Sequence, residues 1–212
     1  MTSTLTAAQV VMLPALPGFE MINRYPDKMH NVFAAKILPG EYYVTRHDEM
    51  IVTVLGSCIS ACIRDPAAGI GGMNHFMLPA DNQARGPTHV DAAARYGNYA
   101  MEHMVNDILK HGGRRDRLEV KIVGGGRILA QMTDIGRRNI EFVRHYIHCE
   151  GLRLVGTDVG GIHPRKVQYF PMNGRAKVKR LTSLHNNTVQ QRESEYMNEL
   201  KQKPVAGDVE LF

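Results

Sequence analysis

The chain has 212 residues, of which 43% are hydrophobic and 22% are charged, close to the averages of soluble globular proteins. This balance excludes a fully disordered chain, a collagen and a coiled coil. At roughly 100–200 residues per domain, the length predicts one domain with appendages. The early apolar run at residues 10–13 is far shorter than the ~20 residues of a membrane helix, so we expect no membrane insertion. Three cysteines make no disulfide framework, which favours the cytoplasm.

The net charge of +5 is unevenly distributed along the chain. Residues 110–185 carry a net charge of +10, whereas residues 1–109 carry −3 and residues 186–212 carry −2. A basic segment can serve nucleic acid, an acidic membrane surface or an acidic protein, and a solvated basic face is the simplest interpretation. Zinc-finger spacing and Trp are absent, and aromatic residues are scarce in the basic part. We therefore expect no nucleic-acid partner.

Residues 1–31 are predicted to be a flexible N-terminal lead-in, because proline and glycine interrupt any periodic pattern there. From residue 32 the pattern changes to short apolar runs separated by tight turns, which is typical of an antiparallel meander. The strands expected in this part are residues 41–45, 50–55, 58–63 and 70–78.

A helix is predicted over residues 91–111, where Met101, Val105 and Ile108 form one apolar stripe that ends at two glycines. A strand at residues 118–123 follows, then a helix at 138–149 and a strand at 152–159. A final hairpin is expected around Asn173 and Gly174. The order of these elements predicts an α+β domain over residues 32–184.

Residues 185–212 are predicted to be a polar tail, whose composition favours a tether over a packed element. The last six residues, GDVELF, alternate acidic and apolar side chains. They could add a strand to a partner's sheet or dock as a short motif, although an edge strand folded back on the domain, or disorder, is favoured.

The strongest chemical signal surrounds Cys58, which follows a predicted strand end beside Gly56 and Ser57. Such a cysteine can expose its sulfur while nearby backbone N–H groups face a substrate carbonyl. A histidine can lower the pKa of the thiol, and antiparallel pairing of the next strand would bring His75 alongside Cys58. Thr53 could bond the second imidazole nitrogen. The alternatives are a buried apolar cysteine and a core histidine.

Other candidate sites have simpler explanations. Cys62 could form a redox pair with Cys58, but a packed core thiol is favoured. Cys149 lies near His145 and His148, yet no second cluster completes a zinc site, so no metal is expected. The glycines at 124–126 lack the Gly-Lys-Ser/Thr ending of a phosphate loop, and a tight turn bordering the active site is the better interpretation.

Several strings carry a family resemblance: LGSC (55–58), DP (65–66), GMNHFMLP (72–79), GGG (124–126), IGRRN (135–139), DVGG (158–161) and RKV (165–167). Over roughly residues 33–183 they resemble the chemoreceptor glutamine deamidase family, CheD. The resemblance implies a Cys–His–Thr triad at Cys58, His75 and Thr53. It also implies a fold similar to the catalytic domain of the cytotoxic necrotizing factor toxins, a β-sandwich flanked by helices.

The function implied by this resemblance is a cysteine amidohydrolase, a protein-glutamine glutaminase that converts glutamines of methyl-accepting chemotaxis receptors to glutamates through a glutamyl thioester. Gly56, Ser57 and Asn74 would form the oxyanion or substrate-positioning group, and no metal or organic cofactor is required. Hydrolysis of a glutamyl methyl ester is an expected side activity.

The alternative is a non-catalytic adaptor that binds receptors and a CheC-type phosphatase, and a general cysteine protease is disfavoured. For the enzyme, Cys58 should be the thiol most sensitive to alkylation, with Cys62 and Cys149 packed.

Overall fold

The computed structural model describes residues 11–79, 92–128, 135–182 and 187–202, which form two five-stranded mixed sheets, three α-helices and a 3₁₀ helix. The first sheet has the order β1 (Asn23–Asp27), β2 (Val32–Lys36), β4 (Glu49–Leu55), β9 (Arg165–Phe170), β10 (Arg175–Arg180). The second has the order β3 (Tyr42–Thr45), β6 (Ile70–Asn74), β5 (Ile59–Asp65), β7 (Glu119–Gly124), β8 (Arg153–Val159). The helices are α1 (Ala92–Lys110), η1 (Arg115–Arg117), α2 (Ile135–Cys149) and α3 (Asn187–Gln202).

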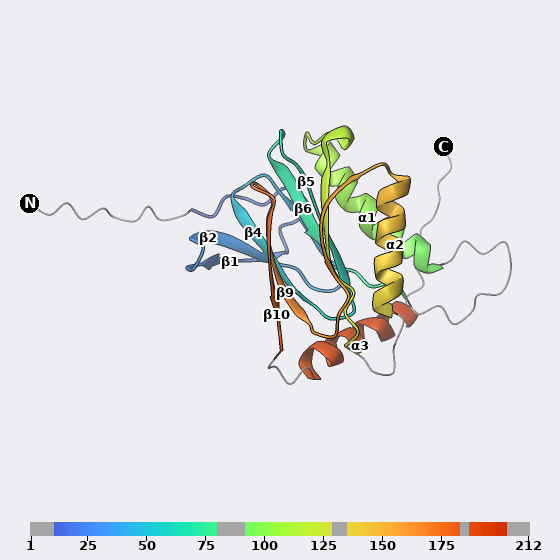
Figure 1. Ribbon diagram of the computed structural model, residues 1–212. Helices are drawn as coiled ribbons and strands as arrows, with labels where there is room; N and C mark the ends of the chain where they lie inside the picture. The colour runs from blue at the N-terminus through green and yellow to red at the C-terminus, as the bar shows by residue number, and fades with distance from the viewer. Residues whose placement is uncertain (1–10, 80–91, 129–134, 183–186, 203–212) are drawn as a thin grey trace, which may run out of the picture.

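The two sheets share one continuous core, and α1 and α2 pack on the second sheet, while α3 runs across one end of the molecule (Figure 1). Strand β4 shows how the sequence produces this arrangement. Ile51 and Leu55 alternate with Met50 and Val52, and all four are buried, so β4 is covered on both faces. Ile51 and Leu55 belong to the shared core, and Thr53 lies on the same side of the strand. No helix among the described residues is long and apolar enough to cross a membrane.

The α+β class is confirmed, and most predicted elements exist within a few residues of their expected bounds. The hairpin around Asn173 and Gly174 is also confirmed, because β9 and β10 pair antiparallel and Gly174 has a positive φ of 70°. The predicted strand at residues 70–78 is shorter than expected and ends at Asn74.

The expected meander is wrong at its first two connections, since β4 and β5 also lie in different sheets, and only β5 and β6 pair antiparallel as expected. Strands β3 and β4 follow each other in the chain but lie in different sheets: β3 pairs with β6, and β4 pairs with β2 and β9. A strand that is buried on both faces needs neighbours on both sides and a layer above and below it. The alternation of single residues does not reveal which sheet supplies those neighbours.

The expected domain boundaries, residues 32 and 184, leave out structured segments on both sides. Residues 23–27 form β1, which pairs antiparallel with β2, and Phe19 is buried against the rings of Tyr42 and Tyr43. Pro26 obscured this strand in the sequence, although an edge strand tolerates proline because one side of it needs no ladder hydrogen bonds.

The expected tether is a helix in its first part. Residues 187–202 form α3, and its Tyr196 and Met197 belong to the shared core. Three buried side chains on a strongly polar helix gave too weak a periodic signal to predict packing. The GDVELF segment at 207–212 lies outside the described residues.

Candidate active site

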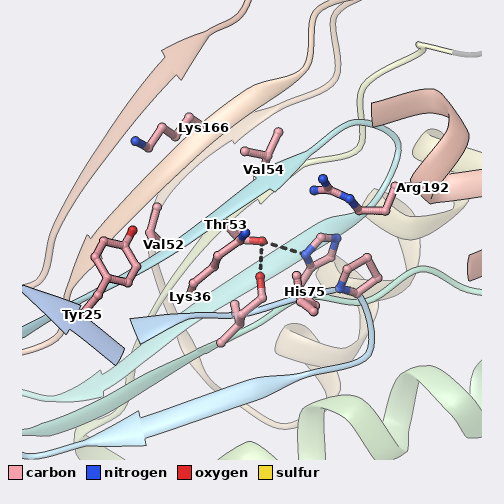
Figure 2. A pocket seen from close by; sticks show the side chains of 11 residues that line it. Tyr25, Lys36, Val52, Thr53, Val54, His75, Lys166 and Arg192 are labelled. Atoms are coloured by element: carbon pink, nitrogen blue, oxygen red, sulfur yellow. Dashed lines mark hydrogen bonds between the residues drawn. The ribbon is translucent and has the colours of Figure 1, made fainter. Parts of the chain in front are cut away.

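Thr53 and His75 are held together in the core between the two sheets (Figure 2). The Thr53 hydroxyl lies 2.8 Å from the carbonyl oxygen of Ile37 and 2.8 Å from Nδ1 of His75. A carbonyl only accepts, so the single hydroxyl proton goes to Ile37 and Nδ1–H of His75 donates to Thr53. Nε2 is therefore the unprotonated nitrogen, and within the described residues it has no hydrogen-bond partner.

Cys58 lies beside this histidine because the strands around them pair as the sequence predicts. Ile59 and Phe76 form an antiparallel bridge, with N–H to carbonyl distances of 2.9 and 3.0 Å. The Sγ of Cys58, a ring nitrogen of His75 and a carboxylate oxygen of Glu193 all lie within 4.8 Å of one another. All three side chains are buried. The structure thus brings Cys58, His75 and Thr53 together.

In the turn formed by residues 56–58, each of the three backbone carbonyl groups accepts a hydrogen bond from another segment of the chain. Gly126 N–H donates to the Gly56 carbonyl at 2.7 Å, and Gly125 N–H donates to the Cys58 carbonyl at 2.7 Å. The Ser57 carbonyl accepts from the side-chain amide of Asn139 on α2, at 2.8 Å. With the carbonyls fixed on one side, the N–H groups of residues 56–58 converge on the other side. Such a group of backbone donors is an anion-binding nest.

A carboxylate from α3 fills this nest. Glu193 accepts from the N–H groups of Gly56 (2.8 Å), Ser57 (2.8 Å) and Cys58 (3.2 Å). The Ser57 hydroxyl donates to the same carboxylate at 2.7 Å. The negative charge therefore sits where these N–H groups would stabilise an oxyanion formed beside Cys58. Neither the resemblance nor local spacing pointed to Glu193, which lies 135 residues from Cys58 in an expected tether.

Two glycines beside the turn leave room for close contacts, and at Gly124 the backbone itself requires glycine. A Cβ on Gly56 would lie 2.1 Å from Cδ1 of Ile128 and 2.8 Å from the Glu193 carboxylate. Gly124 has a φ of 120°, and a Cβ there would lie 2.3 Å from the Cys58 carbonyl oxygen. Residues 124–126 border the site, as expected, but they do not form a tight turn: Gly124 ends β7, and Gly125 and Gly126 donate to the carbonyls of Cys58 and Gly56.

The pKa shifts of Cys58 and His75 favour the uncharged form of both side chains near neutral pH. Burial raises the pKa of Cys58 well above its usual value, and the negative charge of Glu193 raises it further. Burial lowers the pKa of His75 to about 3, and the nearby Arg192 adds to that shift. Sequence reasoning expected His75 to lower the pKa of Cys58. The opposite shift arises because the site is closed to water and holds a carboxylate.

Asn74 is not brought into this cluster. Its side-chain oxygen accepts from the Ala61 N–H at 2.8 Å, and its amide donates to the Ala100 carbonyl on α1 at 3.0 Å. Both polar ends are thus used to tie β6 to β5 and α1. Asn139, which belongs to the IGRRN string, is the asparagine that contacts the turn, through its bond to the Ser57 carbonyl. Its side-chain oxygen accepts from the Leu78 N–H at 2.9 Å.

The two remaining thiols differ from each other. Cys62 is buried in the core, as predicted, and burial raises its pKa to about 12. Cys149 is exposed at the end of α2, with Sγ 3.4 Å from Nε2 of His145, so the expectation that it is packed is wrong. At the end of an amphipathic helix, the sequence does not define which of the last residues still face the core.

Among the described residues, the cluster spaced to hold a metal ion is Cys58, His75 and Glu193. Thiolate, imidazole and carboxylate are zinc ligands in general. Here, however, the Glu193 carboxylate already accepts four hydrogen bonds, which accounts for its burial without a metal.

A cavity of about 250 Å³ opens beside the Thr53–His75 pair (Figure 2). Three cationic side chains, Lys36, Lys166 and Arg192, contribute to its walls, and Arg192 comes from α3. The complete lining is Tyr25, Lys36, Ile37, Leu38, Pro39, Val52, Thr53, Val54, His75, Lys166 and Arg192.

Comparisons with known proteins assign this chain to a family. A family model described as CheD chemotactic sensory transduction matches residues 77–180. A relative from Halorhodospira halophila, named "Probable chemoreceptor glutamine deamidase CheD", is 57% identical over 96% of this chain and 95% of its own length. The chain belongs to the CheD family. The resemblance stated from sequence motifs is confirmed.

Other CheD relatives cover similar shares of the chain. Proteins of the same name from Hahella chejuensis and Saccharophagus degradans are 55% and 50% identical, over 93% and 97% of this chain and 94% and 96% of theirs. A solved Neisseria meningitidis protein of the DUF152 family has a TM-score of 0.36 and 9% identity, over 57% of this chain and 53% of its own. That score is too low to assign the fold.

Proposed function

We propose that this CheD protein is a protein-glutamine glutaminase that deamidates glutamine side chains of methyl-accepting chemotaxis receptors. One observation carries the proposal: a buried thiol beside a histidine, whose tautomer is set by a threonine, adjoins a nest of three N–H groups. The relatives, which are named as probable chemoreceptor glutamine deamidases, supply the substrate class.

In the proposed reaction Cys58 is the nucleophile and His75 is the general acid and base. The Sγ attacks the carboxamide carbon while Nε2 of His75 takes the thiol proton. The imidazolium then gives this proton to the departing nitrogen, so the C–N bond breaks and ammonia leaves a γ-glutamyl thioester. Water attacks the thioester with His75 as base, the S–C bond breaks, and the products are glutamate and the restored thiol.

The backbone supplies the electrostatic part of the mechanism. The N–H groups of Gly56, Ser57 and Cys58 would hold the oxyanion of each tetrahedral intermediate, a role for which the loss of one donor typically costs about 10²–10³ in rate. Thr53 would act through His75 by keeping its proton on Nδ1. Asn74 is left out of this mechanism because its amide is already bonded.

Two expectations from the resemblance remain predictions. They are the likeness to the catalytic domain of the cytotoxic necrotizing factor toxins and the association with a CheC-type phosphatase.

Mass spectrometry of receptor peptides tests the function. Incubation with the full chain should add about one mass unit at selected glutamines, because OH replaces NH₂. Cys58→Ala should abolish this change. Cys149→Ala is the matched control, since it removes an exposed thiol and should leave the activity intact. Receptor modification that persists in Cys58→Ala would contradict the assignment. A Cys58→Ala protein that retains the whole chemotactic phenotype would instead indicate an adaptor.

A further inference from the structure

Glu193 is an unusual residue to find closed inside this protein. Its side chain is buried, and its partners are the N–H groups and hydroxyl of residues 56–58. Within the described residues it forms no ion pair with a cationic side chain. Burying a carboxylate costs much free energy unless hydrogen bonds compensate for the lost water. The nest therefore provides that compensation and binds a γ-carboxylate.

The helix that carries Glu193 is fixed to the domain on the same face, one turn before and one turn after this residue. The Gln190 side chain donates to the Ile128 carbonyl at 2.9 Å. The hydroxyl of Tyr196 contacts that of Tyr96 on α1, and Met197 is buried. Positions 190, 193 and 197 share one helix face, so docking of α3 places Glu193 in the nest as part of a larger contact.

The γ-carboxylate of glutamate is also the chemical product of glutamine deamidation. In Glu193 that group is bonded to the backbone donors of the proposed oxyanion site, and it lies within 4.8 Å of Cys58 Sγ. We propose that α3 is an intramolecular product mimic: it inhibits the active site by holding Glu193 in the place of the reacted substrate side chain. This inference rests on the proposed function, and it adds a form of regulation to it.

The state of the reactive groups supports the inference. With α3 in place, Cys58 is fully buried, and the pKa shifts of the thiol and of His75 keep both groups uncharged. A receptor glutamine can reach Sγ only after Glu193 leaves the nest. Its departure also removes a negative charge that opposes formation of the thiolate.

The first test compares Glu193→Ala with Glu195→Ala, which removes the same charge from an exposed position of α3. Glu193→Ala should speed both iodoacetamide labelling of Cys58 and deamidation of receptor peptides by about tenfold or more. This factor corresponds to the loss of even one hydrogen bond to a charged group. Glu195→Ala should change neither rate by more than about twofold.

The two readouts separate this inference from the proposed function. Labelling of Cys58 requires no deamidase activity. If Glu193→Ala labels faster but deamidates no receptor peptide, α3 shields Cys58 and the proposed function is contradicted. Wild-type activity on receptor peptides together with unchanged rates in Glu193→Ala would overturn the inhibition and leave the function standing.

The second test uses the protein as its own substrate. In Glu193→Gln the carboxamide occupies the nest beside Cys58, so the chain should deamidate its own residue 193. Water supplies the incoming oxygen, ammonia leaves, and the peptide that contains residue 193 gains about one mass unit. The double variant Cys58→Ala/Glu193→Gln should keep its glutamine. If the introduced glutamine persists in a Glu193→Gln preparation that deamidates receptor peptides, residue 193 does not occupy the substrate position and the proposal is wrong.

Discussion

A single hydroxyl determines how His75 can act. Thr53 has one proton, the Ile37 carbonyl takes it, and Nδ1 of His75 must therefore donate to Thr53. The ring is fixed with its lone pair on Nε2, the nitrogen that would accept the proton of the Cys58 thiol. The role of Thr53 is thus to position the imidazole and set its tautomer.

Replacement of Thr53 by valine keeps the shape of the side chain but removes both hydrogen bonds. We expect kcat on receptor peptides to fall about 100-fold, the lower end of what general acid–base catalysis contributes, with little change in KM. Thr53→Ser restores the hydroxyl and should recover most of the rate. A valine variant that keeps its activity, together with a serine variant that loses it, would show that packing of the methyl group, and not the hydrogen bond, is what matters.

The reactivity of the three thiols follows from burial. Cys149 is exposed, whereas Cys58 and Cys62 are buried and their pKa values are raised. Iodoacetamide reacts with the thiolate, so we expect Cys149 to label first in the wild-type chain, contrary to the order expected from sequence. Peptide mapping over time measures this order. Early labelling of Cys58 would mean that the site is open in solution, without α3 docked.

At the scale of elements, the turn that ends β5 is held by one carboxylate. Asp65 is buried and accepts from the N–H groups of Ala67, Ala68 and Arg114 and from the guanidinium of Arg117. It therefore connects the β5–β6 turn to the segment that leads into β7. Burial alone would raise the pKa of Asp65, but the bonds to Arg117 and to the backbone lower it to about 2.

This shift predicts how stability depends on pH. A carboxyl group whose pKa is lowered on folding stabilises the protein above its unfolded pKa, and this contribution is lost as the pH falls through the folded value. Asp65→Asn should reduce the free energy of unfolding by about 1–3 kcal/mol at pH 7. In denaturant titrations the difference from wild type should shrink between pH 4 and pH 2. A difference that stays constant over that range would rule out ionisation of Asp65 as its cause.

At the scale of the whole molecule, the positive charge of residues 110–185 is partly displayed on one edge. Strand β10 lies at the end of the first sheet, and its exposed residues are cationic. These residues are Arg175, Lys177, Lys179 and Arg180. A cationic edge also discourages pairing of this strand with other chains.

We expect this positive charge to steer the protein toward acidic receptor helices. Binding of receptor fragments should weaken as salt rises to about 0.15 M, where the screening length is roughly 8 Å, and mainly through slower association. Lys179→Glu should slow association. The control is Lys28→Glu, which makes the same charge change at an exposed site outside the basic segment and should slow association less. Association rates that do not respond to salt or to Lys179→Glu would exclude a role of β10 in docking.

The sequence by itself determined the part of the site whose members are close along the chain. Cys58 and His75 lie on either side of one tight turn, and antiparallel pairing across that turn leaves little freedom in their placement. Thr53 lies on the strand before the cysteine, where alternation of side chains already selects its face. The motif strings added the family to this local geometry.

Only the tertiary structure decided what surrounds that pair. Asn139 lies 82 residues from Ser57, and Glu193 lies 135 residues from Cys58, so no local period or turn pattern connects them. Whether the thiol is charged depends on burial and on a carboxylate brought by α3, and both follow from packing. Contacts between distant segments are selected by the free energy of the whole folded core. For this reason the residues of the candidate site could be predicted from the sequence, but the helix that packs over them could not.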